Sequence, residues 1–235
     1  MPSAADLEES VDNILDTAFE ARDGRVVPET KDVALKNGAV KIEATFLYAD
    51  LAGSAKLARL CPWQTTAKII RAFLDCSARL IRDRGGHIRS FDGDRVMGVF
   101  MGDSKNSDAA DCAREIYYSV LKIINPKAKA KFTSIRDNGI EIRHAVGIDT
   151  GEVRAVRAGI RNNNDLVWVG KAASLSAKLS DCREYPYCSY ISSRVYERLR
   201  DASKIAKGEN MWESRQFNFA GVNETVYRSS WWKKP

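Results

Sequence analysis

The segment from Ile88 to Phe100 constrains the fold of this chain more than any other. It reads I-R-S-F-D-G-D-R-V-M-G-V-F, with apolar, β-prone residues in both arms and Asp92-Gly93 between them. Asp-Gly between two such runs favours a tight turn, because glycine adopts positive φ at little cost. The sequence therefore predicts a β-hairpin that holds Asp94 at its mouth.

A second predicted strand with an acidic end lies upstream of the hairpin. The run A-T-F-L-Y-A-D-L-A-G-S carries Asp50 at its end, followed by small residues. Alternation along the strand places Phe46, Tyr48 and Asp50 on one face. A hard divalent cation prefers oxygen ligands, and Mg²⁺ is typically held by one or two carboxylates together with substrate phosphates. Asp50 and Asp94 are therefore the candidate metal-binding pair.

The length of 235 residues predicts one large domain with added terminal segments. We expect an N-terminal helix and linker over residues 1–38, the main domain over 39–229 and a tail over 230–235. No apolar run approaches the ~20 residues of a membrane helix, and the acidic N-terminus has no apolar signal-peptide core. We therefore expect a cytoplasmic protein with no membrane partner.

Cysteine, histidine and charge content narrow the possible chemistry. The five cysteines are odd in number and form no C-x-x-C pair, so neither a zinc site nor a disulfide framework is expected. Two histidines are too few for a histidine-rich metal site, and no motif supports a Ser-His-Asp triad. The net charge of +6 favours an anionic partner, which leaves nucleotide, nucleic acid and acidic membrane surface open.

Apolar spacing predicts the remaining elements. Apolar residues between Leu7 and Phe19 recur at helical spacing, and we expect this amphipathic helix to pack against the core, with dimerisation or regulation as alternatives. Further predicted elements are a strand over 40–49, helices over 64–84 and 107–124, strands over 140–148 and 153–160 with a turn at Thr150-Gly151, a strand over 166–169, and a helix after Gly170. This order predicts an α+β, ferredoxin-like domain with a mainly antiparallel sheet and helices on one face.

Four segments in this order resemble the class III nucleotidyl cyclases over roughly residues 40 to 228. They are F-L-Y-A-D-L-A-G-S at 46–54, D-G-D-R-V-M-G-V-F at 92–100, A-V-G-I-D-T-G-E-V at 145–153 and V-G-K-A-A-S-L-S-A-K-L at 169–179, with weaker agreement at 220–228. The resemblance implies a sheet flanked by helices. It also implies two divalent metal ions per site, Mn²⁺ or Mg²⁺, held by Asp50, Asp94 and the backbone carbonyl of Leu51. The turn at Ala52, Gly53 and Ser54 would offer free backbone N–H groups to phosphate.

The sequence departs from the family at the positions that read a purine base. The family's base-reading lysine corresponds to Ser90, and its second base-reading residue, often aspartate, corresponds to Val167. A slip in the alignment would instead place Arg89 and Asp165 there. Serine can donate or accept a hydrogen bond, whereas valine leaves a dry wall. This combination argues against ordinary adenine or guanine recognition.

Three further positions differ from the family. Its transition-state asparagine and arginine correspond to Ser174 and Lys178, which lie one turn apart on the predicted helix. Lysine retains the positive charge but lacks the planar fork of arginine. The usual triphosphate lysine corresponds to Ala220, so Arg154 or another basic residue would take that role.

A chain that keeps the metal-binding aspartates but lacks the purine-reading residues resembles the pyrimidine cyclases of the Pycsar anti-phage system. This resemblance implies conversion of UTP to 3′,5′-cyclic UMP and pyrophosphate, a product that a cyclic-nucleotide-binding effector reads. Cytidylate cyclisation, purine cyclisation in an atypical pocket and a non-enzymatic nucleotide-binding module remain alternatives. Nucleic acid is not the expected partner, because Asp50 on the face of Phe46 and Tyr48 would repel phosphate.

The family resemblance also implies a head-to-tail homodimer with composite sites. In such a dimer, one chain supplies the metal aspartates and the other supplies the base-reading and transition-state residues. We expect Ser174 and Lys178 to lie on the opposite side of the sheet from Asp50 within a single chain.

Overall fold

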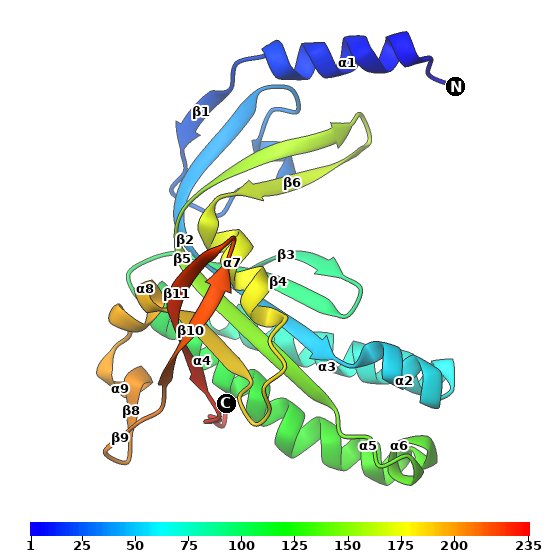
Figure 1. Cartoon of the computed structure of the whole chain (residues 1–235), viewed down its shortest axis with the longest axis vertical. Coiled ribbons are helices and arrows are strands. Elements are labelled where there is room, and N and C mark those ends of the chain that lie inside the picture. The colour runs from blue at the N-terminus through cyan, green and yellow to red at the C-terminus, as the bar shows by residue number, and fades with distance from the viewer.

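The computed structural model describes residues 1–235, which form a nine-stranded sheet with helices on both faces (Figure 1). The strand order is β10-β11-β7-β5-β2-β4-β3, with β1 paired to β2 and β6 paired to β5. Only the β1–β2 and β5–β7 pairs are parallel, so the predicted mainly antiparallel α+β fold is confirmed. The strands are β1 (Glu20–Asp23), β2 (Gly38–Ala52), β3 (His87–Asp92), β4 (Arg95–Phe100), β5 (Arg143–Ile160), β6 (Asn163–Val169), β7 (Ser189–Ser192), β10 (Glu213–Phe219) and β11 (Val222–Ser229), with β8 (Ile205–Ala206) and β9 (Glu209–Asn210) forming a separate small hairpin.

Helices cover both faces of this sheet, so the expectation of helices on one face was wrong. The helical elements are α1 (Ala4–Asp16), η1 (Thr30–Asp32), α2 (Ser54–Leu60), α3 (Trp63–Asp83), α4 (Lys105–Tyr118), the π-helical segment η2 (Ser119–Ile124), α5 (Asn125–Lys131), α6 (Thr133–Asp137), α7 (Lys171–Ser180), α8 (Ser193–Glu197) and α9 (Asp201–Lys204). Leu47 and Ala49 of β2 pack in the larger core cluster with α3 and α4, whereas Phe46 packs in a second cluster with α7. Both faces of β2 are apolar, and each therefore requires its own helical cover.

The predicted hairpin is confirmed. Asp92 of β3 pairs with Arg95 of β4, which leaves Gly93 and Asp94 as the connecting residues. Gly93 has a φ of +60°, the conformation that favours glycine in a tight turn.

The turn predicted at Thr150-Gly151 is absent, because β5 continues through it as one long strand. Thr150 pairs with Thr45 of β2, and Gly151 pairs with Ala44. The long neighbouring strand satisfies the backbone on both sides of the glycine, and this pairing overrides the local turn signal.

The N-terminal segment forms the outer end of an arm that projects from the body of the domain (Figure 1). The start of β2, the end of β5, β1 and β6 build this arm, and α1 lies at its tip. No residue of α1 is buried, so the expectation that this helix packs against the core was wrong. The helix also ends at Asp16, before Phe19. None of the helices combines the length and the apolar character that a membrane crossing needs.

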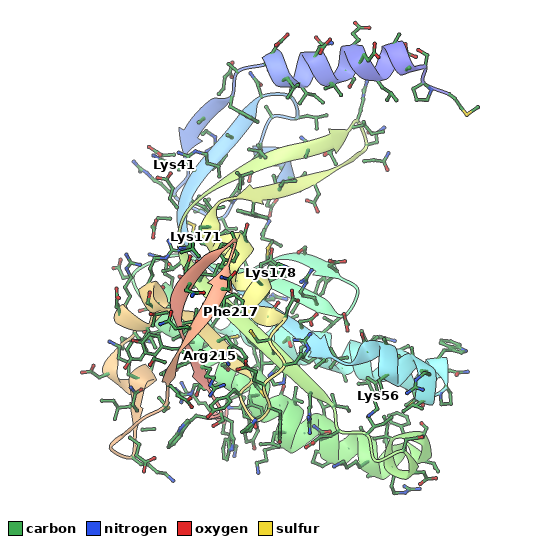
Figure 2. All side chains as sticks on the ribbon, in the orientation of Figure 1. Lys41, Lys56, Lys171, Lys178, Arg215 and Phe217 are labelled. Atoms are coloured by element: carbon green, nitrogen blue, oxygen red, sulfur yellow. The ribbon has the colours of Figure 1, made fainter.

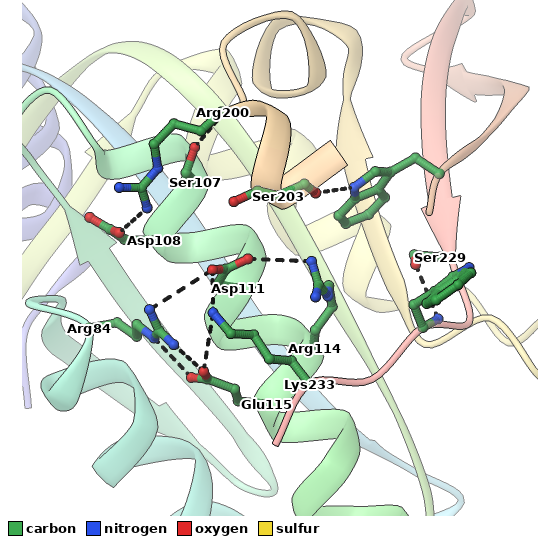
Figure 3. Close-up of polar contacts among 12 residues, drawn as sticks. Arg84, Ser107, Asp108, Asp111, Arg114, Glu115, Arg200, Ser203, Ser229 and Lys233 are labelled. Carbon is green, nitrogen blue, oxygen red and sulfur yellow. Dashed lines mark hydrogen bonds and ion pairs between the residues drawn. The ribbon is translucent and has the colours of Figure 1, made fainter. Parts of the chain in front are cut away.

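The C-terminal tail is bound to α4 by an ionic network (Figure 3). The Lys233 ammonium lies 2.5 Å from an Asp111 carboxylate oxygen and 3.7 Å from an oxygen of Glu115. Arg84, at the end of α3, pairs with the same Glu115, whose side chain is 1% exposed. Trp231 packs against the larger core cluster. The tail is therefore part of the domain's packing.

Candidate active site

The two candidate metal-binding aspartates lie together at the end of β2. The backbone N–H of Leu51 donates to the Asp94 carbonyl over 3.3 Å, which fixes the hairpin mouth against this strand end. Burial raises the pKa of Asp50, the Arg183 guanidinium lowers it, and the neighbouring Asp94 charge raises it again. The two carboxylates therefore share one small, partly desolvated region.

This pair of carboxylates fits a hard cation that also binds substrate phosphates. No group of three or more His, Cys, Asp or Glu side chains in the chain forms a complete metal cage. Two carboxylates and a backbone carbonyl match the partial donor set that Mg²⁺ uses when phosphates complete its coordination. Arg183 pairs with Asp50 and supplies the positive charge there.

A basic cavity of about 380 Å³ lies beside this pair. Ala52 and Gly53 line it, together with the cations Lys56, Arg143 and Arg183. Two carboxylates line it as well, Glu141, which pairs with Arg143, and Glu184, which pairs with Arg228 outside the cavity. Ser54 is the first residue of α2, and Lys56 projects from the same short helix (Figure 2). The predicted phosphate segment is thus next to three basic side chains.

Within one chain, Arg154 is not among these cations. It lies opposite Lys41 in the β2–β5 ladder, whereas Asp50 lies opposite Ala145. Nine residues of strand separate the two positions on β5, a span of ~30 Å at the usual rise. Arg154 instead pairs with Glu152 over 2.9 Å.

Two predicted substrate-binding residues and one predicted catalytic residue line a second cavity, also of about 380 Å³. Ser90 of β3, Val167 of β6 and Ser174 of α7 come together there. The other lining residues are Tyr48, Arg89, Met97, Leu166, Trp168, Ala173 and Ala177. The lining contains no carboxylate and no lysine. Neither Asp50 nor Asp94 contributes to this cavity.

The structure separates Arg89 and Asp165, the two residues that a slip in the family alignment would place at the base-reading positions. Arg89 lines the cavity, where its Nη1 donates to the Pro28 carbonyl over 3.1 Å and its buried Nε has no partner. Asp165 lies outside it and accepts hydrogen bonds from the Thr30 hydroxyl and the Leu166 backbone N–H. Trp168 is held edge-on against Phe46, with ring centroids 5.4 Å apart.

Helix α7 lies on the same sheet face as Asp50, which corrects the expectation that Ser174 and Lys178 would be on the opposite side. Phe46 packs in one cluster with α7, and alternation puts Asp50 on the Phe46 face. Arg183, just beyond α7, reaches Asp50 directly. Lys178 is exposed on α7 (Figure 2), with its ammonium 3.8 Å from Asp181.

Sequence reasoning missed Lys56, Tyr48 and Arg183 as functional candidates. Tyr48 lies two positions before Asp50, and strand alternation already predicted that both side chains share one face of the sheet. Its ring lines the second cavity beneath the Arg95 guanidinium, which lies 5.6 Å from the ring centroid, and burial raises the pKa of Tyr48. Arg183 lies in the loop after α7 and belongs to no motif, so only tertiary structure brings it to Asp50.

Several uridylate cyclases resemble this chain over nearly its whole length. A uridylate cyclase from Rhodovulum sp. (strain MB263) is 47% identical over 232 residues, covering 98% of this chain and 97% of the relative. A uridylate cyclase from Burkholderia cepacia is 40% identical over 233 residues, covering 98% of each. One from Xanthomonas perforans is 41% identical over 214 residues, covering 91% and 90%. No protein-family model matches the chain.

Solved structures of nucleotidyl cyclases share the fold at low identity. The guanylyl cyclase Cya2 superimposes with a TM-score of 0.67 at 19% identity, covering 83% of this chain and 95% of that structure. The adenylyl cyclase CyaB from P. aeruginosa gives a TM-score of 0.60 at 19% identity, covering 81% and 95%. The sequence relatives and the shared fold lead to one conclusion: this chain is a nucleotidyl cyclase with the class III fold and belongs to the uridylate cyclase family.

Proposed function

We propose that the protein converts UTP to 3′,5′-cyclic UMP and pyrophosphate. The observation that carries the proposal is the second cavity, lined by Ser90, Val167 and Ser174, which we call the base cavity. Its lining has no lysine and no carboxylate for purine recognition. Identity of 40% or more over nearly the full length to proteins named uridylate cyclase supports the same substrate.

The polar groups of the cavity favour uracil over cytosine. Arginine can only donate hydrogen bonds, and Arg89 has a buried Nε without a partner. Uracil has a carbonyl where cytosine has an amino group, so a fixed donor matches the first base and opposes the second. The hydroxyls of Ser90 and Tyr48 can donate or accept, and therefore adapt to either base.

The acidic pair and the basic cavity suit the triphosphate. Asp50, Asp94 and the Leu51 carbonyl would hold two divalent ions, Mn²⁺ or Mg²⁺. Ions bound there supply charge neutralisation and favour deprotonation of the 3′-hydroxyl. Lys56 and Arg183 lie where they would meet the phosphates, and Ala52, Gly53 and Ser54 would offer backbone N–H groups.

The reaction itself requires positioning and charge stabilisation. The ribose 3′-oxygen forms a bond to the α-phosphorus, the bond from that phosphorus to the bridging oxygen breaks, and pyrophosphate leaves with that electron pair. The 3′-hydroxyl proton passes to solvent. Ser174 would hydrogen-bond the ribose, and Lys178 would meet the transferred phosphoryl group as a point charge.

The site is proposed to be shared between two copies of the chain. The base cavity of one chain contains neither of its aspartates, and Lys178 forms an ion pair with Asp181 and none with Asp50. In a head-to-tail homodimer, the aspartates of one chain would complete the cavity of the other. Mixing inactive Asp50→Ala chains with inactive Lys178→Ala chains should therefore restore part of the activity. No recovery after demonstrated subunit exchange would contradict a shared site.

A direct assay tests the substrate. Purified protein is incubated separately with UTP, CTP, ATP and GTP in the presence of Mn²⁺, and products are identified by mass spectrometry. Cyclic UMP should dominate, since a site that leaves buried polar groups unpaired discriminates by up to ~10⁴. Formation of cyclic AMP or cyclic GMP without a pyrimidine product would overturn the proposal.

Two variants test the pocket residues separately. Ser90→Lys with Val167→Asp should reduce the preference for UTP over ATP, because it introduces a lysine and a carboxylate into the base cavity. Arg89→Gln should reduce the preference for UTP over CTP, because the amide can also accept a hydrogen bond. An unchanged UTP-to-CTP ratio in Arg89→Gln would remove this residue from base recognition.

The resemblance to the Pycsar cyclases extends the proposal to the role of the product. Cyclic UMP would serve as a second messenger for a cyclic-nucleotide-binding effector during phage infection. Cells carrying Asp94→Asn should accumulate no cyclic UMP after phage challenge, whereas cells with the unaltered protein should.

A further inference from the structure

Helix α1 has an apolar stripe that its own chain does not cover. Leu7, Val11, Ile14 and Leu15 follow helical spacing, and their exposed fractions are 56, 51, 71 and 76%. The gap of about 730 Å³ between α1 and the arm is lined on the helix side mostly by polar residues, including Asp6, Glu9 and Asn13. Ile14 also lines that gap, whereas Leu7, Val11 and Leu15 do not. These three apolar residues of the stripe therefore face away from their own chain.

The same helix carries only negative charge. Its acidic residues are Asp6, Glu8, Glu9, Asp12 and Asp16, and it has no lysine or arginine. Asp6 belongs to the helix N-terminal capping box, but the other four acidic side chains form no salt bridge. Glu8 and Asp12, one turn apart, flank the apolar stripe. A partner for this helix should offer an apolar groove bordered by positive charge.

A groove of this kind lies between α3 and the η2–α5 segment, and we call it the α3–α5 groove. It has a volume of about 280 Å³, and apolar residues including Ile69, Ile123 and Phe132 line it. Lys68, Lys127 and Lys131 line it as well, and none of them forms a salt bridge. Lys68 lies over the Phe132 ring, 5.9 Å from its centroid. The lining's one acidic residue, Asp75, is paired with Arg79.

We propose that α1 of one copy docks in the α3–α5 groove of a second copy. Within one chain, α1 lies at the tip of the arm, and α5 lies at the opposite end of the molecule (Figure 1). A chain therefore cannot fill its own groove. In a two-fold dimer, both helices would dock reciprocally, which closes the assembly without leaving a free groove. The recognition mode is that of an amphipathic helix whose apolar anchors enter a groove and whose charges match the rim.

A disulfide trap tests the contact directly, without substrate and independently of the proposed reaction. Cys76 lines the groove, and Val11→Cys places a thiol in the centre of the stripe. Mild oxidation of Val11→Cys should yield a covalent dimer in which mass spectrometry finds residues 11 and 76 linked. Val11→Cys with Cys76→Ser, and Glu9→Cys on the polar side of the helix, are the matched controls and should form no such link. A non-covalent dimer in which Val11→Cys gives no 11–76 link, or a link within one chain, overturns the proposal.

Charge reversal gives a second test that does not depend on disulfide geometry. Glu8→Lys with Asp12→Lys should raise the dimer dissociation constant about tenfold in sedimentation velocity, as should Lys127→Glu with Lys131→Glu. Combining all four should return the constant to within about threefold of the unaltered protein, because the charges again complement each other. The same charge changes at the exposed Asp201 and Glu209 serve as control. Additive weakening of the dimer with no rescue would show that α1 does not dock in the α3–α5 groove.

Discussion

The buried His144 ring should make the stability of the protein depend steeply on pH in mildly acidic solution. His144 is 3% exposed, and neither ring nitrogen has a hydrogen-bond partner. The rings of Phe73 and Tyr117 lie 5.9 and 5.7 Å from it. Burial, with a smaller effect from the Arg183 charge, lowers the pKa of His144 to about 3.

The sign and the size of the effect follow from this lowered pKa. In the unfolded chain histidine has a pKa of about 6.5, so below that pH the unfolded state binds a proton that the folded state excludes. The stability contributed by the neutral ring is complete above about pH 6.5 and is lost as the pH falls toward about 3. The slope is ~1.4 kcal/mol per pH unit, or about 2.5 kcal/mol between pH 6.5 and 4.5.

His144→Phe should abolish this contribution, because phenylalanine preserves an aromatic ring between Phe73 and Tyr117 and takes up no proton. Urea unfolding of both proteins across pH 4.5 to 7.5 gives the difference in free energy of unfolding at each pH. That difference should shift in favour of the variant by about 2.5 kcal/mol as the pH falls from 6.5 to 4.5. His87→Phe, at an exposed position on β3, is the matched control. Parallel pH curves for His144→Phe and the unaltered protein would refute the reasoning.

Three further changes test other parts of the structure. Glu115→Ala should lower the free energy of unfolding by ~3 kcal/mol in urea titrations, because it leaves Arg84 without its buried partner; a loss below ~1 kcal/mol would contradict this. Gly147→Ala should cost about as much, since a Cβ there would lie 2.1 Å from the Ser176 carbonyl oxygen of α7, and near-normal stability would be inconsistent with that contact. Asp50→Asn and Asp94→Asn should each reduce cyclase turnover at least ~100-fold with unchanged circular dichroism, and either variant retaining a tenth of its activity would remove that residue from the metal site.

Local sequence determined those helices, strands and turns whose local preferences agree with the tertiary packing around them. The Asp92-Gly93 turn needed only its own residues, because positive φ and the flanking β-prone runs specify a hairpin without outside help. Helix α3 lies within one residue of its prediction, because its apolar spacing and the Gly85-Gly86 stop coincide with the packing against the sheet. Alternation on β2 also placed Tyr48 and Asp50 on one face.

Tertiary structure decided the features that depend on distant partners. Continuous pairing with β2 overrides the local turn preference at Gly151. The sequence of α7 likewise does not specify which face of the sheet this helix covers. Arg183 reaches Asp50 because the loop after α7 returns to the end of β2. No residue near Arg183 in the sequence predicts this return. The apolar stripe of α1 correctly predicted a helix but not a place in the core. Periodicity shows that a face must be buried, whereas the identity of the surface that buries it depends on where the chain, or a second copy of it, brings a complementary groove.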